Sequence, residues 1–542
     1  MPEAQASMLF RAAGPLAPLQ RGALWCAGLS GWRRQVAAIV LGALAAAALS
    51  PVDLTPMLVV SMSGLVWLSD GVATRRGAAL LGWSFGFGFF VAGLYWIAAA
   101  LFVDIARFWW LLPFAVVALP AGLALFPALA LLAYHEARER LHLAGTPRIL
   151  VLACAWAAAE YVRGHVLTGF PWNLLGYAWA GAFPGALTVL QSAALFGIYG
   201  LSLLTVVAAA LPARLGDLGS GRFWAPAAAL LMVAVAAGGG AWRLSTATRD
   251  TVPGVMLRLV QPSIPEKLKN DPQALAQNFR RLLELSAAPG AARITDIVWP
   301  EAAAPPLLER YPELRQTIAK IIPQGGLLLT GVVRAEPLTG WPPAHIWNGL
   351  EAINDKGDVI ASYDKAHLVP FGEYVPLRGI LPIDKIVPSI GDFSRGPGPR
   401  TLDLPGLPPV SPLICYEAIF PGAVIDPAQR PQWLLNVTND AWYGVSSGPF
   451  QHLAIARVRA IEEGMPLVRD ANNGVSAVFD AYGRVRARLD LNDVGVVDAA
   501  LPSALPPTPY ERVRDAAFWV ILLALLAIAG FSSLIDRRRS AR

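Results

Sequence analysis

The chain has 542 residues and a formal net charge of +6; 55% of the residues are hydrophobic, only 15% are charged, and the mean hydropathy is +0.48. This length predicts two or more units, and a composition this apolar, with 18 tryptophans, excludes an ordinary soluble protein and predicts membrane-spanning segments. The three cysteines are too scattered for a disulfide framework and the six histidines form no HxxxH group, so no metal site is expected.

Eight apolar runs, each long enough to cross a hydrocarbon core of about 30 Å, follow a mixed N-terminal tail of residues 1–34. No cleavable signal peptide is expected in this tail, because the first long apolar run begins only near Gln35. The predicted spans are residues 35–51, 54–69, 78–102, 108–133, 149–167, 185–211, 223–241 and 517–535. The first seven form a predicted membrane domain at 35–242, and residues 511–542 hold the eighth helix and a basic tail.

The basic residues between these runs all fall on one side of the membrane if every run spans it. They are Arg33, Arg34, Arg75, Arg76, Arg138, Arg140, Arg148, Arg214, Arg222 and the arginines at 537–539. The short loops around Asp53 and Asp104 carry few basic residues, so the positive-inside rule places both termini in the cytoplasm. The seventh span then delivers residues 243–510 to the outer side as an extracytoplasmic domain.

The loop after the fifth run, residues 163–173, leaves two interpretations open. Its aromatic residues either form an interfacial belt or line a path for lipid tails beneath the outer domain. Glu160, near the end of the same run, is an intramembrane acid and therefore a functional candidate. Cys26 and Cys154 are expected to be inert.

Residues 243–510 alternate short β-rich runs with amphipathic helical segments, which predicts an α/β sandwich of catalytic-domain size. Strands are expected at 255–261, 297–299, 327–333, 348–353, 359–364, 411–415, 433–437 and 476–480, and helices at 273–287 and 450–464. The basic stretch 457–469 is expected to be helical, with a solvated or paired face.

The run Val410–Ile414 ends abruptly in Cys415, which Tyr416 and Glu417 follow directly. This pattern predicts a buried strand that turns sharply, so that the thiol can reach a substrate while a neighbouring backbone N–H awaits an oxyanion. The alternative is an inert core thiol, because free cysteine is among the most buried residue types.

Two further signatures supply chemistry that a thiol nucleophile needs. Glu301 ends the apolar run in Trp299-Pro300-Glu301, and a carboxylate there can take the thiol proton. Lys365 ends another predicted strand and can hold the oxygen of a tetrahedral intermediate together with the Tyr416 N–H. Base, oxyanion cation and nucleophile together form a complementary set.

The order Glu301, Lys365, Cys415, within W-P-E, Y-D-K-x-H-L-V-P-F-G-E-Y and C-Y-E, resembles the Glu–Lys–Cys triad of the nitrilase superfamily. Apart from the first thirty or so residues, the chain is similar to bacterial apolipoprotein N-acyltransferases, also at 438–444, 448–452 and 457–473. The resemblance implies a multi-span α-helical membrane domain of about eight transmembrane helices. It further implies a nitrilase-like α-β-β-α sandwich on the periplasmic side of a bacterial inner membrane. One departure is Asn270, where the family often carries a tryptophan.

The resemblance also implies a two-step acyl transfer without a cofactor. Cys415 would take a fatty acyl chain from a membrane phospholipid as a thioester. The α-amine of the N-terminal S-diacylglyceryl cysteine of an apolipoprotein would then receive it. Glu301 would act as base, Lys365 would stabilise both tetrahedral intermediates, and Glu373 would orient the Lys–Cys pair. The other supporting residues are Tyr416 and Glu417 on the oxyanion side and Trp442 near the acyl entrance. The implied partners are the phospholipid donor, the apolipoprotein acceptor and membrane lipids, with no nucleic acid, and the protein is expected to act as a monomer.

Two other functions remain open on the sequence alone. A membrane-tethered nitrilase-type amidase would pass through the same thioester and give the acyl group to water. A transporter or scaffold would carry an inactive nitrilase-like domain, although the presence of all three triad residues argues against it. His367 and His452 are expected to form structural hydrogen bonds, and Asn439 and Asp440 to fix a turn.

Overall fold

The computed structural model describes residues 17–217, 220–269, 271–338, 343–376, 378, 385–386 and 391–540. The predictions for Asn270 and for the first sixteen residues lie outside this part of the chain. The chain divides into two compact units. The first comprises Met1–Tyr95, Pro113–Ser245 and Val513–Arg542, and the second comprises Trp96–Leu112 and Thr246–Arg512.

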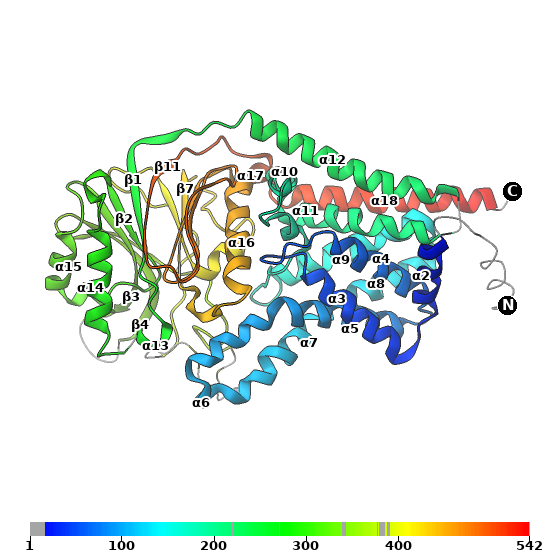
Figure 1. The fold of residues 1–542 in the computed structure, drawn as a ribbon, viewed down its shortest axis with the longest axis horizontal. Helices are drawn as coiled ribbons and strands as arrows, with labels where there is room; N and C mark the ends of the chain where they lie inside the picture. Colours follow the sequence, from blue (N-terminus) through cyan, green and yellow to red (C-terminus); the bar gives the residue numbers. More distant parts are fainter. Residues whose placement is uncertain are drawn as a thin grey trace. The chain divides into compact units, whose positions relative to one another are not determined.

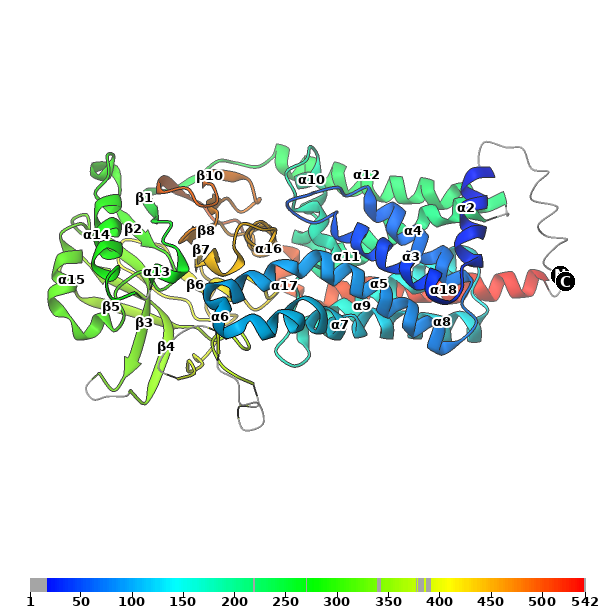
Figure 2. The same ribbon diagram turned by 60° about the horizontal axis from the view of Figure 1, so that its bottom comes forward.

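The first unit is built from helices (Figure 1). Its longer helices are α2 (Ala17–Gly28), α3 (Gly31–Ala46), α4 (Met57–Asp70), α5 (Arg75–Leu94), α8 (Leu125–Leu141), α9 (Gly145–His165), α11 (Ala193–Ala210), α12 (Trp224–Ser245) and α18 (Ala516–Ser540). Short helical turns connect them: η3 (Phe114–Ala118), α7 (Leu119–Leu123), η4 (Leu175–Trp179), α10 (Ala186–Leu190), η5 (Leu211–Gly216) and η6 (Ser220–Phe223). Helix α18 packs on α9 and α11, and its C-terminal end lies at the same end of this unit as α2 (Figures 1 and 2). The last helix of the chain therefore completes the helical unit that the first half begins.

Five stretches of the described chain are long and apolar enough to cross a membrane. They are Arg75–Leu111, Phe114–Leu141, Ala193–Gly216, Trp224–Ser245 and Ala516–Ser533. Three other predicted runs are also helical, but α3 and α4 have only 16 and 14 residues, and α9 carries Arg148, Glu160 and Arg163. The predicted multi-helix apolar region is confirmed, whereas a total of eight spans stays a prediction.

Two predicted runs are not continuous helices. The run 108–133 passes from the second unit into the first at Pro113 and changes at Pro120 from the π-helical turn η3 into α7, because proline lacks the N–H that a regular helix interior needs. The run 185–211 contains two helices, and Gly197 inside α11 has φ 66°, a conformation that other residues rarely adopt.

Three of the arginines that the sequence assigns to one side of the membrane, Arg138, Arg148 and Arg214, meet in one charged cluster of the helical unit. Arg148 Nη2 lies 2.8 Å from Asp217 Oδ1, and its Nε lies 3.3 Å from Asp70 Oδ1. Arg138 approaches Asp70 at 3.6 Å, and Arg214 approaches Asp217 at 2.5 Å. Residues from the ends of separate helices are thus paired with one another, and the side of the membrane on which they lie stays a prediction.

Glu160 and the loop after α9 are satisfied inside the helical unit. The Glu160 carboxylate accepts hydrogen bonds from Trp156 Nε1 at 3.1 Å and from the Leu175 N–H at 3.0 Å. Arg163 donates to the carbonyl of Trp172 at 2.6 Å, and Trp172 is fully buried. Full burial of Trp172 disfavours the interfacial-belt interpretation for this residue, one of the two that the sequence leaves open for the loop.

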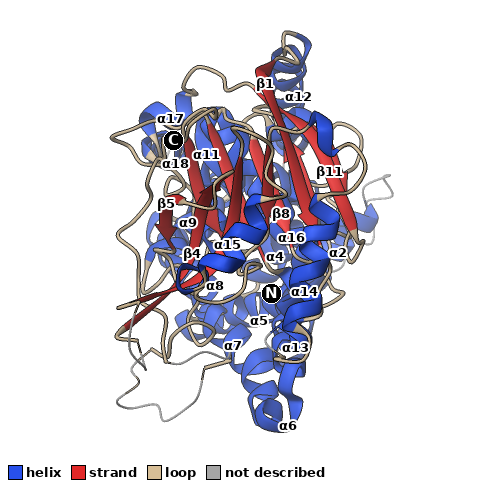
Figure 3. Cartoon of the chain, turned by 90° about the vertical axis from the view of Figure 1, so that its left-hand side faces the viewer, coloured by secondary structure: helices blue, strands red, loops and turns tan. Residues whose placement is uncertain are grey.

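The second unit contains two mixed β-sheets (Figure 3). The first has the order β11-β1-β2-β3-β4-β5, and the second has the order β10-β9-β8-β7-β6. The first sheet consists of β1 (Thr251–Gln261), β2 (Asp296–Trp299), β3 (Leu327–Glu336), β4 (His345–Asn354), β5 (Val359–Asp364) and β11 (Gly495–Pro502). The second consists of β6 (Val410–Ile414), β7 (Trp433–Thr438), β8 (Leu467–Ala471), β9 (Ser476–Phe479) and β10 (Val485–Leu489). Each sheet contains three neighbouring parallel strands, β1-β2-β3 or β6-β7-β8, whose carboxyl ends lie at a common edge.

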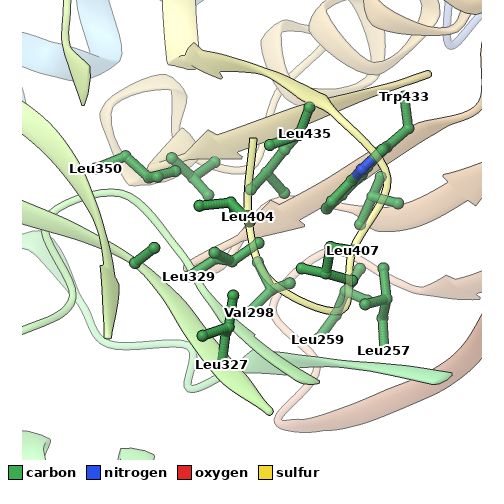
Figure 4. Packing of buried hydrophobic residues seen from close by; sticks show 14 of the residues in the cluster. Leu257, Leu259, Val298, Leu327, Leu329, Leu350, Leu404, Leu407, Trp433 and Leu435 are labelled. Carbon is green, nitrogen blue, oxygen red and sulfur yellow. The ribbon is translucent and has the colours of Figure 1, made fainter. Parts of the chain in front are cut away.

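Three apolar clusters separate the four layers of this unit. The middle cluster lies between the sheets and joins Leu257, Leu329 and Leu350 of the first to Trp433 and Leu435 of the second (Figure 4). A second cluster packs the first sheet against α14 (Leu275–Ser286) and α15 (Pro312–Ala319), and a third packs the second sheet against α16 (Gly448–Glu463). The predicted α-β-β-α sandwich is confirmed.

Local sequence explains the two helices that cover the sheets most extensively. In α14, Phe279, Leu282 and Leu283 recur at helical spacing and face the first sheet. Helix α16 begins with Pro449 in its first turn and ends at Gly464, whose φ is 63°. Because α16 ends there, the prediction that 457–469 is one helix is wrong, and Arg469 lies on β8.

Residues Trp96–Leu112, hereafter the 96–112 arm, belong to the second unit although the sequence places them in the membrane domain at 35–242. The arm consists of most of η1 (Tyr95–Asp104), with α6 (Ile105–Phe108) and η2 (Trp109–Leu111). The apolar stretch Arg75–Leu111 has 37 residues, nearly twice the roughly 20 that a bilayer requires. Its second half is therefore free to pack on the sandwich.

Candidate active site

Cys415 lies at the carboxyl end of β6, where the chain turns sharply into η9 (Cys415–Ile419). Its φ of 51° falls in the left-handed region that residues with a side chain seldom occupy. The Cys415 carbonyl lies 3.1 Å from His452 Nε2 and 3.4 Å from the Asn436 amide nitrogen, which donates to it. These contacts hold the unusual backbone in place, so the predicted sharp turn at the thiol is present.

Glu417 links this turn to the loop that carries Lys365. Its Oε2 accepts the Ile414 N–H at 2.8 Å, while its Oε1 accepts the Tyr363 hydroxyl at 2.8 Å and the Ala366 N–H at 2.7 Å. Burial raises the pKa of Glu417, and these donors oppose the rise. Glu417 thus connects the Cys415 turn to the Lys365 loop through hydrogen bonds.

Lys365 lies in a buried set of carboxylates and amides. Its Nζ donates to Glu373 Oε1 at 2.9 Å and lies 3.8 Å from Glu301 Oε1. The Asn348 amide donates to both acids, at 2.7 Å to Glu301 and at 2.9 Å to Glu373. The second oxygen of Glu301 accepts the Asn439 N–H at 2.8 Å. The predicted base, cation and supporting acid are thus brought together.

The sheet fixes this set through strand ends. Glu301 follows β2, and Lys365 follows β5, where its N–H donates to the Asn348 carbonyl at 2.9 Å. Gly331 on β3 allows the chain at Glu301 to pass closely, because a Cβ there would lie 2.6 Å from the Glu301 Cα. Position 331 therefore needs glycine for the acid to reach its place.

Burial and the neighbouring charges set the ionisation of the site. Burial lowers the pKa of Lys365, but Glu373 and Glu301 outweigh it and hold the pKa above its ordinary value, so the side chain is an ammonium. Burial, and then the Glu301 carboxylate, raise the pKa of Cys415 to about 12 against the opposing charge of Lys365. The resting sulfur is a thiol whose proton must leave during attack.

Three fully buried side chains, Asp440, Arg469 and His452, interact with one another next to the Cys415 turn. His452 Nδ1 lies 3.1 Å from Asp440 Oδ1, and Arg469 Nη2 lies 2.7 Å from Asp440 Oδ2. Burial opposes ionisation of Asp440, but the Arg469 charge prevails and lowers its pKa to about 2. His452 is thereby oriented toward the Cys415 carbonyl, which confirms the structural hydrogen bonding predicted for it.

The remaining predicted residues flank the sulfur in different ways. Tyr416 is buried, with its ring edge-on to Phe420 at 5.1 Å between centroids. Trp442 is half-buried in η10 (Asp440–Tyr443), and from this loop it is Tyr443 whose hydroxyl reaches the sulfur, at 3.8 Å. Sequence reasoning missed Asn348 and Tyr443; a polar residue within the apolar run of β4 was a signal for the first. In the part of the chain that the structure describes, no three His, Cys, Asp or Glu side chains are grouped to hold a metal.

Comparisons with known proteins match both units. Residues 41–211 match the family model described as the apolipoprotein N-acyltransferase N-terminal domain, and residues 257–508 match the carbon-nitrogen hydrolase model. The apolipoprotein N-acyltransferase of Rhodopseudomonas palustris is 43% identical over 524 residues, which cover 92% of this chain and 95% of the relative. That of Bradyrhizobium diazoefficiens is 44% identical over 518 residues, with the same coverage. Among solved structures, an amidase from Nesterenkonia sp. matches with 20% identity and a TM-score of 0.35, covering 50% of this chain and 97% of the amidase.

Proposed function

The chain belongs to the apolipoprotein N-acyltransferase family, and from this premise we propose that Glu301, Lys365 and Cys415 carry its acyl transfer in two steps. The donor is a membrane phospholipid, and the acceptor is the α-amine of the N-terminal S-diacylglyceryl cysteine of an apolipoprotein. The observation that carries the proposal is the buried set of Glu301, Lys365, Glu373 and Asn348 beside the thiol turn.

In the first step, Glu301 takes the Cys415 proton while the sulfur bonds to the carbonyl carbon of a phospholipid ester. The charge that develops on the carbonyl oxygen is stabilised by the Lys365 ammonium. The ester C–O bond then breaks, and Glu301 returns the proton to the departing alkoxide. The products are a lysophospholipid and a Cys415 thioester.

In the second step, the neutral α-amine of the acceptor attacks the thioester carbon. Glu301 takes a proton from the attacking nitrogen, and Lys365 again stabilises the oxyanion. The C–S bond breaks, the amide leaves with the acyl chain, and the Cys415 sulfur recovers a proton from Glu301. Since a free α-amine has a pKa of about 8, a substantial fraction of it is neutral near physiological pH.

The supporting residues act through the triad in this proposal. Glu373 anchors Lys365, since it is the closer of the two carboxylates, and Glu417 sets the spacing between the Lys365 loop and the Cys415 turn. Tyr416 contributes its backbone N–H to the oxyanion side, and Trp442 borders the acyl entrance. These roles extend the family resemblance to positions that match its motifs.

The membrane arrangement is part of the same proposal. We propose eight spans in a bacterial inner membrane, with the membrane domain at 35–242, the catalytic domain at 243–510 in the periplasm and a final helix within 511–542. The ion pairs of Arg138, Arg148 and Arg214 with Asp70 and Asp217 support a common side for these basic residues, and by the positive-inside rule we propose that this side and both termini are cytoplasmic. A monomer suffices for the chemistry, because one chain supplies all three reacting groups.

Intact-mass measurement after exposure of the purified protein to phospholipid vesicles tests the chemistry. The native protein is expected to gain the mass of one fatty acyl group, and Cys415→Ala is expected to gain none. Cys154→Ala is the matched control, since it removes a buried thiol from α9 and should leave acylation intact.

Two results would contradict the proposal. An acyl adduct that persists in Cys415→Ala would move the nucleophile elsewhere. Free fatty acid released steadily without any acceptor would indicate the amidase alternative, which the acyltransferase relatives disfavour by matching 92% of the chain.

A further inference from the structure

Tyr443 approaches the sulfur that the proposed mechanism uses. Its hydroxyl oxygen lies 3.8 Å from Cys415 Sγ, within hydrogen-bonding distance for sulfur. Burial raises the pKa of Tyr443 well above its ordinary value, with the neighbouring sulfur as the next cause, so the phenol keeps its proton throughout the physiological range. While the sulfur is a thiol either atom of this contact can donate, but once the sulfur has lost its proton the phenol O–H is the donor.

The ring of Tyr443 is held by an aromatic residue from a distant part of the sequence. Trp96, in the 96–112 arm, packs edge-on to it with 4.7 Å between ring centroids and an interplanar angle of 68°. Trp96 is only 5% exposed, and its Nε1 donates to Gln451 Oε1 on α16 at 3.1 Å. His452 closes another side, with its ring 5.7 Å from that of Tyr443.

A glycine at the start of α16 makes this packing possible. A Cβ at Gly448 would lie 2.8 Å from the Tyr443 Cβ and 2.9 Å from the Trp96 ring, closer than real Cβ contacts. Gly448, Tyr443 and Trp96 therefore fit together as one unit. Close packing around the ring, in addition to the contact with Sγ, therefore fixes the direction of the Tyr443 hydroxyl.

We propose that Tyr443 is a further catalytic residue, which donates its O–H to the Cys415 sulfur, and that Trp96 of the 96–112 arm is its positioning residue. The inference rests on the proposed thioester chemistry. The sulfur carries negative charge twice in the cycle, when Glu301 removes its proton and when the amine expels it from the thioester. A fixed O–H donor stabilises both states, and donation to a charged acceptor is stronger than donation to a neutral one.

The surroundings of the Cys415 sulfur are built from both halves of the sequence. The sandwich residues 246–512 supply the nucleophile, base, cation and phenol, but Trp96 lies in the other half of the sequence. The chain segment that directly continues helix α5 thus completes the surroundings of the sulfur. Removal of the 96–112 arm should therefore lower the reactivity of the Cys415 thiol even if the sandwich folds.

The test measures the rate at which iodoacetamide alkylates Cys415 in the full-length protein, quantified at that residue by peptide mass spectrometry between pH 6 and 9. Tyr443→Phe removes one oxygen and should slow alkylation by roughly three- to tenfold at every pH, since losing the donor lowers the thiolate fraction. Acyl-enzyme formation from phospholipid should slow by a similar factor. Tyr311→Phe removes the same atom at a largely exposed site and should react at the native rate.

The direction of the change separates catalysis from packing. A variant that merely loosens the site exposes the buried thiol and is alkylated faster, so a native or faster rate in Tyr443→Phe overturns the inference. In Trp96→Ala the phenol is no longer held toward the sulfur, so adding Tyr443→Phe to this variant should not change its alkylation rate further, because the donor is already lost. Additive effects in the double variant overturn the positioning role of Trp96. Failure of Cys415→Ala to abolish the acyl adduct would instead count against the proposed function itself.

Discussion

Lys365 lies between two carboxylates at unequal distances, 2.9 Å to Glu373 and 3.8 Å to Glu301. A buried ammonium needs such partners, because its desolvation costs several kcal/mol. The closer acid is committed to the lysine and to the Val369 N–H, which its Oε2 accepts at 2.8 Å. Glu301, the more distant acid, makes no close contact with the ammonium, so its carboxylate can exchange a proton. Unequal pairing thus supports the proposed division, in which Glu373 anchors Lys365 and Glu301 acts as the base.

Glu373→Gln tests this division. The amide keeps the shape but removes the charge that raises the pKa of Lys365, so Glu301 must compensate the ammonium alone and becomes a weaker base. We expect acyl-enzyme formation to slow by about 100-fold, a typical loss for disturbed oxyanion stabilisation. Pre-steady-state acylation kinetics measure the effect, with the exposed Glu313→Gln as control. An unchanged acylation rate would show that the anchor is unnecessary.

The sequence identified single residues where chemistry and a strand end coincide. Glu301, Lys365 and Cys415 each follow a recognisable apolar run, so their motifs marked them. Asn348 stands out only as a polar residue within the run of β4, and its role could not be inferred from that signal, because the role depends on how β4 pairs with β5. That antiparallel register sets Gly349 opposite Asp364 and so brings Asn348 next to the lysine. Pairings between strands are long-range facts that no local pattern contains.

Among the described secondary-structure elements, all eight predicted strands are present, whereas β8, β10 and β11 were not predicted. Strand β5 (Val359–Asp364) has the predicted bounds, and β2 differs by one residue. Strand β8 escaped prediction because Arg469 and Asp470 interrupt its apolar pattern, although both side chains are fully buried. Strand β10 was missed because it is a partly exposed edge strand. In β8, an ion pair formed in the folded protein allows Arg469 to be buried in a strand that the local sequence pattern does not indicate.

Strand β4 carries an acid that makes the stability of the sandwich depend on pH. Glu351 is fully buried, with Arg334 Nε at 3.6 Å, and burial followed by the Glu309 carboxylate raises the pKa of Glu351 to about 8. The folded state therefore binds the proton more tightly than the unfolded state. The resulting stabilisation is complete below about pH 4 and is lost as the pH rises toward 8.

Glu351→Gln should remove this dependence. Between pH 5 and 8 we expect the Tm of the native protein in detergent to fall by roughly 5 °C more than that of the variant. Thermal unfolding followed by circular dichroism at several pH values provides the measurement. Glu284→Gln on α14 changes an exposed acid and should keep the native pH profile. Parallel profiles for the native protein and Glu351→Gln would refute the assignment.

At the scale of the whole molecule, the two units are interleaved along the chain. The helical unit is interrupted once by the 96–112 arm and again by residues 246–512. Both substrates of the proposed reaction are anchored in lipid, so the thiol has to operate close to a bilayer. An apolar arm that continues directly from a membrane helix and contacts the catalytic loop meets that need through chain connectivity.

The orientation across the membrane is a property of the whole molecule that labelling of introduced cysteines can test. If the basic loops are cytoplasmic, Arg140, whose side chain is 74% exposed, lies inside, whereas Glu313 of α15 lies outside. In spheroplasts of a Cys26→Ser background, a membrane-impermeant maleimide should label Glu313→Cys at once and Arg140→Cys only after the membrane is permeabilised. The reverse order would place the sandwich in the cytoplasm. The thiol would then lie on the wrong face for the proposed acceptor, and the acyl-transfer assignment would have to be revised together with the topology.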